Sequence, residues 1–282
     1  MSKRQSSFML IVSLLISGVV FLQMGLYLIS ILAGWNVRFN LVEVCHSWIK
    51  AFGLSSLEYV LDGFVVYTLL FAIWKIGLHW FHAARMKKRF ELYKENALTI
   101  AMNQTYNSGK KEIIVISYPA PVAITVGLSR PKIVVSTGLM SLLNDDELTA
   151  VVYHEMYHKE SRDPLKIYLL SLCSSTLWYI PILKWCHQKY RIVNELLADG
   201  FAIEKQATSV NLGSALLKML KVGKQETMPF AYASFADTSV NYRIDYIVNP
   251  FMDIQLKLPR RVVFLSAMIF SLICALFIYA LA

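Results

Sequence analysis

The stretch VVYHEMYHKE, residues 151–160, places two histidines four residues apart and a glutamate directly after the first. On an α-helix, residues i and i+4 share a face, so His154 and His158 can point at one metal ion. Zinc binds neutral imidazole readily, and a catalytic zinc site uses three protein ligands and a water. Glu155 can accept a proton from that water and later give it to the leaving amine of a cleaved peptide. The pattern predicts two zinc ligands and a catalytic base.

A third ligand is available in the segment NELLADG, which contains Glu195 and Asp199, again four residues apart. Glu195 can complete the zinc site, and Asp199 can orient a ligand histidine by contacting its other ring nitrogen. Asp163, five residues after His158, is a second supporting carboxylate. The alternative for Glu195 is an ion pair with Arg191 one helical turn earlier, which would contribute only a few tenths of a kcal/mol.

The alternative for the histidines is a helix that carries them without a metal. Val151, Val152 and Met156 make this helix apolar on most sides. Unpaired histidines would be costly in such surroundings, so the composition of the helix favours the metal site.

The elements around these residues indicate an α+β domain. Three β-branched runs at residues 112–118, 122–128 and 132–136 alternate with proline-containing turns and predict a small sheet. Residues 144–160 predict a helix with Asn144 as N-cap and Glu147 at the third helical position, close to a capping box. Residues 86–102 and 189–206 predict two more helices, the first continuing out of an apolar run. We expect a peptide substrate to bind extended, as an added strand beside residues 122–127.

The composition indicates a membrane protein. The chain has 282 residues, is 56% hydrophobic and carries a net charge of +9, whereas about 45–50% apolar residues are usual in soluble domains. Three apolar runs, residues 8–33, 60–81 and 262–282, are long enough to cross a bilayer. The first is too long for the apolar part of a signal peptide and lacks a clear cleavage site.

The basic residues lie at the ends of these runs, and the positive-inside rule therefore predicts an orientation. The N-terminus and residues 86–260 are expected in the cytosol, and residues 34–58 outside. This gives two N-terminal spans in residues 1–85, a protease domain in 86–260 and a C-terminal span in 262–282. Membrane lipid is thus an expected partner, and the cell membrane the expected location.

A fourth apolar run, residues 167–185, lies between the predicted ligands and contains Pro181. A single crossing would place His158 and Glu195 about 30 Å apart, although zinc–ligand bonds are only about 2.0–2.2 Å long. The run is therefore expected to turn back on the cytosolic side. Whether it re-enters the membrane, lies at its surface or packs within the domain stays open.

Residues 123–201 resemble the M56 family of membrane zinc peptidases, whose members include the BlaR/MecR-type antibiotic sensors. The resemblance rests on VGLSRPKIVVSTGLM, AVVYHEMYHKESRDPLK, WYIPILKW and NELLADGFAI, with a weaker match at NYRIDYIVNP. It implies a gluzincin-type zinc protease domain. By this resemblance the zinc ligands are His154, His158 and Glu195, the catalytic base is Glu155, the supporting residues are Asp163 and Asp199, and Arg243 contacts substrate or has a structural role.

The M48 proteases, which are HtpX-like, share the two zinc motifs but usually carry a His-Pro pair before the late arginine. Here that place reads FADTSVNYRI, so M56 is the better match. The penicillin-binding sensor domain of the antibiotic sensors is missing from this sequence, and antibiotic sensing is therefore not implied.

The sequence thus predicts an α-helical membrane protein with a cytosolic α+β gluzincin-type domain that binds Zn²⁺ and cleaves a cytosolic or membrane-near protein. The resemblance suggests a transcriptional repressor as the substrate of a signalling pathway. The alternatives are an HtpX-like quality-control protease and a non-catalytic membrane protein with a structural zinc site. Nucleic acid is not an expected partner, because the basic residues cluster at membrane edges and no nucleotide-binding glycine motif is present.

Overall fold

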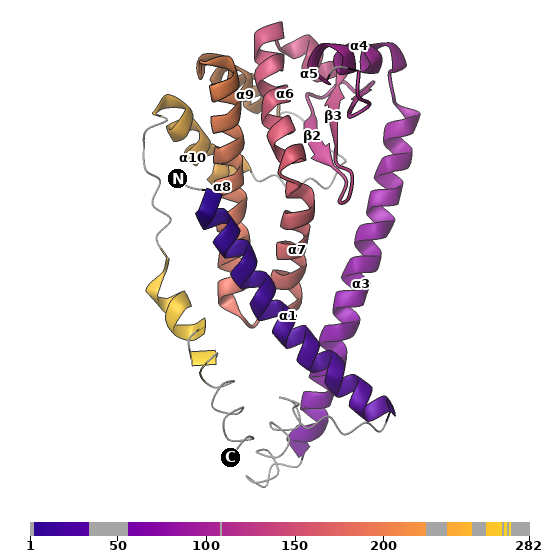
Figure 1. Cartoon of the computed structure of the whole chain (residues 1–282), viewed down its shortest axis with the longest axis vertical. Helices are drawn as coiled ribbons and strands as arrows, with labels where there is room; N and C mark the ends of the chain where they lie inside the picture. Colours follow the sequence, from indigo (N-terminus) through magenta and orange to yellow (C-terminus); the bar gives the residue numbers. More distant parts are fainter. Residues whose placement is uncertain are drawn as a thin grey trace. The chain divides into compact units, whose positions relative to one another are not determined.

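The computed structural model describes residues 3–33, 56–107, 109–223, 236–249, 258–266, 268–269 and 271 (Figure 1). Its chain forms two compact units. The first contains residues 1–6, 81–168 and 190–255, and the second contains residues 7–80, 169–189 and 256–282. The predicted C-terminal span therefore lies largely outside the described residues.

Among the described residues, five helices lie within the first unit, around a small sheet. Four further helices contribute residues to both units. The bounds of the first group are α4 Asn96–Asn107, α5 Thr137–Leu142, α6 Asp145–Glu160, α9 Val210–Gly223 and α10 Ala236–Val248; those of the second are α1 Lys3–Ala33, α3 Ser56–Leu92, α7 Asp163–Thr176 and α8 Pro181–Gln206.

The predicted sheet is confirmed as three strands, β1 Ile113–Ile116, β2 Ala123–Val126 and β3 Lys132–Ser136, in the order β1-β3-β2. β3 pairs parallel with β1 and antiparallel with β2. Successive side chains of a strand point to opposite faces. One face packs against α6 and α5 and the other against the end of α3, which explains the β-branched composition of the strands.

The helix α6 begins as predicted at an Asn144 cap. The Asn144 side chain accepts a hydrogen bond from the Glu147 amide at 2.8 Å, and the Glu147 carboxylate accepts one from the Asn144 amide at 3.0 Å. This capping box satisfies two backbone donors that the first turn leaves free. Glu147 also accepts from Ser214 and Lys218 of α9 at 2.6 and 2.7 Å. The same carboxylate therefore caps α6 and fixes α9 to it.

The predicted helix over residues 86–102 is wrong as a single element. α3 ends at Leu92 and α4 begins at Asn96. Between them the chain pairs with the start of the sheet: the Glu95 amide donates to the Val115 carbonyl at 2.9 Å, and the Ser117 amide donates to the Tyr93 carbonyl at 2.7 Å. Hydrogen bonds to β1 replace helical hydrogen bonds at residues 93–95. They join residues about 20 positions apart, so local sequence patterns do not predict the break.

The helices α1 and α3, most of whose residues belong to the second unit, each contain a stretch long and apolar enough to cross a membrane, residues 3–26 and 63–92. The apolar run 167–185 is broken, because α7 ends at Thr176 and α8 begins at Pro181. Proline is well suited to the first turn of a helix, where its missing N–H has no partner to lose. The turn between them buries Leu177 and Ile180, which pack with residues 16, 20 and 21 of α1.

This turn generates a prediction about membrane topology. In a chain whose four native cysteines are replaced, Ser161→Cys and Gln188→Cys should react with a membrane-impermeant maleimide from the same side of the membrane, because the run between them turns back. Ser47→Cys, in the segment predicted to be external, is the control and should react from the other side. Labelling of positions 161 and 188 from opposite sides would contradict the folded-back arrangement.

Candidate metal centre

Three predicted ligand atoms meet between α6 and α8 in the first unit. The Nε2 atoms of His154 and His158 lie 3.1 Å apart. Glu195 presents Oε2 at 3.5 Å from the Nε2 of His154 and Oε1 at 3.7 Å from that of His158. A tetrahedral zinc about 2.0–2.2 Å from each ligand requires ligand atoms about 3.3–3.6 Å apart. The two imidazoles and the carboxylate are therefore close enough together to hold one zinc ion.

The remaining ring nitrogen of each histidine faces a buried carboxylate. His154 Nδ1 lies 2.8 Å from Asp199 Oδ1, and His158 Nδ1 lies 2.8 Å from Asp163 Oδ2. A proton held on Nδ1 by a carboxylate leaves the lone pair of Nε2 directed at the metal. Both carboxylates are thus placed to fix the ring orientation, the role that the sequence suggested for them.

Arg243 on α10 contacts the site itself. Its Nε and Nη2 donate to the two oxygens of Asp199 at 2.8 and 2.7 Å, and its Nη1 lies 3.2 Å from Glu195 Oε2. Such a two-pronged contact matches the planar guanidinium to the planar carboxylate. Of the two roles left open by the sequence, these contacts favour the structural one.

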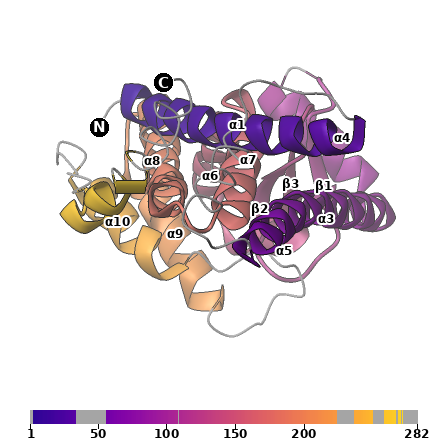
Figure 2. The same ribbon diagram turned by 90° about the horizontal axis from the view of Figure 1, so that it is seen from below.

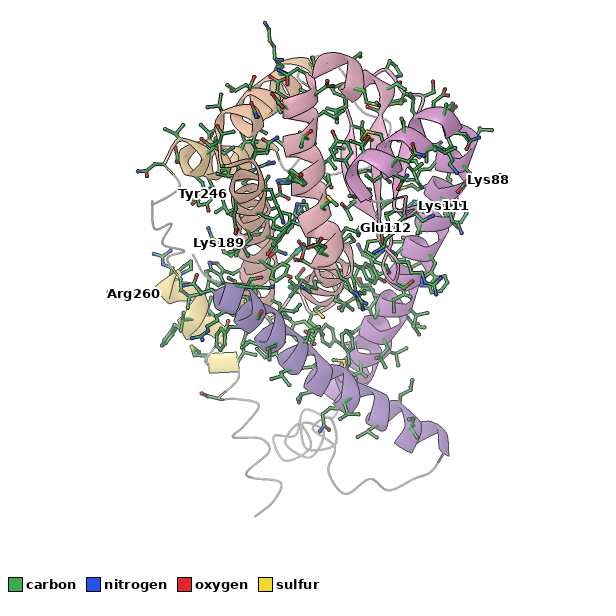
Figure 3. The ribbon with its side chains drawn as sticks, turned by 45° about the horizontal axis from the view of Figure 1, so that its top comes forward. Lys88, Lys111, Glu112, Lys189, Tyr246 and Arg260 are labelled. Carbon is green, nitrogen blue, oxygen red and sulfur yellow. The ribbon has the colours of Figure 1, made fainter. Side chains whose placement is uncertain are left out.

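The helix α10 reaches the site because α8 carries a glycine, Gly200, where the two helices meet. Tyr242 and Tyr246 pack on Ile192 and Leu196 of α8, and Figure 3 shows Tyr246 beside that helix. A Cβ at Gly200 would lie 2.8 Å from the Tyr246 hydroxyl oxygen. Glycine therefore allows the close approach that brings Arg243 to Asp199.

Burial and charge act against each other at these residues. Burial alone would raise the pKa values of Asp199 and Glu195, but Arg243 and His154 outweigh it and hold both below their ordinary values. Burial and the charge of Arg243 would lower the pKa of His154, yet the carboxylates of Asp199 and Glu195 beside its two ring nitrogens raise it to about 9. The carboxylates of Asp199 and Glu195 thus favour a positive charge, either a proton or a metal ion, next to the histidines. A metal ion would displace the His154 proton, because the ligand nitrogen must be unprotonated.

The predicted base Glu155 is buried beside His154 on α6. The Thr125 hydroxyl of β2 lies 2.8 Å from Glu155 Oε2 and 3.0 Å from the backbone carbonyl oxygen of Glu155, and it can donate to either. Figures 1 and 2 show α6 between α8, which carries Glu195, and β2, which carries Thr125. Sequence reasoning assigned no role to the Thr125 side chain, because nothing local pairs a strand residue with a residue 30 positions later.

Two further contacts surround the site without being predictable from motifs. Ser6, at the start of α1, donates to the side-chain oxygen of the buried Asn194 at 3.0 Å. Asn194 directly precedes Glu195 in the chain. Lys159, directly after His158, pairs with Glu112 ahead of β1, and Figure 3 shows Glu112 beside the sheet. Each ligand-bearing segment is thus fixed by an adjacent residue.

Comparison with known proteins decides the family. The profile of the BlaR1 peptidase M56 family matches residues 50–247, more than half of the chain. The chain belongs to the M56 peptidase family. The chain is 24% identical over 223 residues to the regulatory protein BlaR1 of Bacillus licheniformis, a match that covers 72% of this chain and 36% of that protein.

A shorter match joins the chain to a second type of protease. Over 73 residues the chain is 36% identical to protease HtpX homolog 2 of Methanosarcina mazei, and this match covers 25% of each protein. The chain thus spans about a third of the length of the M56 relative and a quarter of the HtpX homolog. The M56 resemblance drawn from the sequence motifs is confirmed.

The contacts of Arg243 generate a prediction about metal affinity. Arg243→Gln should weaken zinc binding by about 10–100-fold, because Asp199 and Glu195 lose the group that orients them. Competition with a chromogenic zinc chelator measures the dissociation constant. Asp245→Asn, an exposed position of the same helix, is the matched control and should leave it unchanged. Equal zinc affinity in the Arg243→Gln and wild-type proteins would show that the arginine does not support the ligands.

Proposed function

We propose that this protein is a membrane-anchored zinc endopeptidase that cleaves a protein at or near the cytosolic membrane surface. The observation that carries the proposal is the meeting of His154, His158 and Glu195 within 4.8 Å, with Glu155 next to the first of them. The two long apolar helices and the membership of the M56 peptidase family support the membrane and protease parts of the proposal.

The residues divide the chemistry between them. A bound zinc would act as a Lewis acid and lower the pKa of water toward about 7. Glu155 accepts the proton of the attacking water and later gives it to the leaving amine. Asp199 and Asp163 hold the two imidazoles in one tautomer, and Arg243 balances the charge of the carboxylates that would otherwise be buried unpaired.

The substrate is proposed to bind along β2, the edge strand of the sheet. The Ser136 amide donates to the Val122 carbonyl at 2.9 Å, and the Ile133 amide donates in the other direction, to Glu112. Hydrogen-bonded and non-bonded pairs alternate along an antiparallel ladder. The Thr125–Ile133 pair is therefore a non-bonded one, and the N–H and C=O groups of Ala123 and Thr125 point to the open edge. A peptide added there would use these groups.

Regulation is the proposed purpose of the cleavage. The relative from Bacillus licheniformis is described as a regulatory protein, and this supports a role in signalling, with a transcriptional repressor as the expected kind of substrate. The match to an HtpX homolog supports a second candidate, quality control of membrane proteins. A defined repressor substrate would be cut at one site, whereas a quality-control protease would cut many unfolded chains.

The central test uses the purified 282-residue chain. We expect about one zinc per chain, loss of the metal in a His154→Ala, His158→Ala double variant, and zinc-dependent cleavage of fluorescein-labelled β-casein, an unstructured protein. Glu155→Gln should keep the zinc but lose at least about a hundredfold in kcat, because it cannot accept the proton. Full zinc occupancy in the double variant, or unchanged cleavage by Glu155→Gln, would overturn the proposal.

A second test concerns the open edge of β2. Ala123→Pro removes an N–H that points to the edge while leaving the bonds between β2 and β3 intact, so we expect KM to rise about fivefold to tenfold, as for one lost hydrogen bond. Ile124→Pro, which removes an N–H directed at β3, should instead lower the melting temperature. Unchanged KM in a folded Ala123→Pro protein would argue against binding along this edge.

A further inference from the structure

Thr125 occupies two interfaces of the site at once. Its backbone groups point to the open edge of β2, where the pairing with Ile133 leaves them free of the β2–β3 ladder. Its hydroxyl lies on the face toward α6, 2.8 Å from Glu155 Oε2. The neighbouring strand residues Ile124 and Val126 face the opposite way, into the cluster around Phe90. The alternation of a strand therefore separates the peptide-facing backbone from the base-facing hydroxyl within one residue.

The geometry points to Thr125 as a positioning residue that aligns Glu155 with the bound peptide, an inference that rests on the proposed function. The Thr125 hydroxyl has a single hydrogen to donate. Its nearer acceptor is Glu155 Oε2 at 2.8 Å, against 3.0 Å for the Glu155 carbonyl, and a bond to Oε2 leaves Oε1 for the water that attacks the peptide. Because the peptide is held by the backbone of the same residue, the distance between the scissile bond and the base depends on one rigid strand position.

Loss of an outward N–H of β2 and loss of the Thr125 hydroxyl are expected to change different kinetic constants. Loss of an outward N–H weakens the binding of peptide and transition state alike, which raises KM. Loss of the hydroxyl leaves peptide binding intact but frees the Glu155 side chain to leave its productive position, which lowers kcat. A small misplacement of a catalytic group is enough for a loss of tenfold or more. A merely structural threonine would change neither constant in this selective way.

The variants follow from the chemistry of the side chain. Thr125→Val has nearly the same shape and β-branching but no hydroxyl, and Thr125→Ser keeps the hydroxyl. With fluorescein-labelled β-casein as substrate and one zinc per chain, we expect Thr125→Val to lower kcat about tenfold, with KM and the zinc dissociation constant within about twofold of wild type. Thr125→Ser should recover most of the lost kcat, and Ala123→Pro should show the opposite pattern, a raised KM.

A second measurement tests the contact without relying on activity. In metal-free protein, Thr125→Val should lower the melting temperature by about 2–4 °C, as expected for one hydrogen bond in a chain of this size. In a Glu155→Ala background the same substitution should have a clearly smaller effect, because only the backbone carbonyl of residue 155 is left to accept.

The possible outcomes are distinct. Unchanged kcat in Thr125→Val, a fall in kcat that Thr125→Ser does not recover, or equal melting shifts in the two backgrounds would overturn the role of Thr125. Each of these results leaves the proposed function standing if Glu155→Gln is inactive and wild type is active. A wild-type protein with bound zinc and no cleavage would overturn the proposed function, and the role of Thr125 with it.

Discussion

The meeting of three potential metal ligands, whose ligand atoms lie within 4.8 Å of one another, is the constraint on which the arrangement of the first unit depends. Two of the atoms come from α6 and the third from α8, and 36 residues separate His158 from Glu195. The chain between them must therefore leave the site and come back to it. The turn at residues 177–180, ahead of Pro181, is where it reverses. The apolar run 167–185 is thus divided between two helices, and the potential metal ligands lie on either side of it in the sequence.

Bringing these residues together places charged groups in a buried environment, which is unfavourable. Contacts between groups of opposite charge offset this cost. Asp199 is fully buried, which would be unfavourable for an isolated carboxylate. It contacts both His154 and the guanidinium of Arg243, and that guanidinium also contacts Glu195. Removing one member of such a network leaves the others buried without a partner, which costs several kcal/mol. Hence α10, although distant in the sequence, belongs to the metal centre as much as α6 and α8 do.

Local periodicity explains which parts of the site the sequence could predict. His154 and His158, like Glu195 and Asp199, are related by one turn of a helix, and the Asn144 capping box is equally local. The three strands were predictable from β-branched runs between prolines. The break between α3 and α4 was not, because it results from pairing with β1, and neither was the contact of Thr125 with Glu155. Such contacts depend on which strand lies at the edge and in which register, and a single sequence does not encode these in its spacing.

The number of ligands distinguishes a catalytic from a structural metal centre. Structural zinc sites are closed by four protein ligands, whereas catalytic sites keep one position open. Among the residues that the structure describes, the group that could hold a metal has three members, His154, His158 and Glu195. A buried carboxylate lies next to them, and its oxygen is held by a threonine hydroxyl. A structural site would gain nothing from a second, non-ligand glutamate kept dry beside it, because burying that charge costs free energy. The arrangement of Glu155 and Thr125 thus supports the proposed proton transfer over a role in metal retention alone.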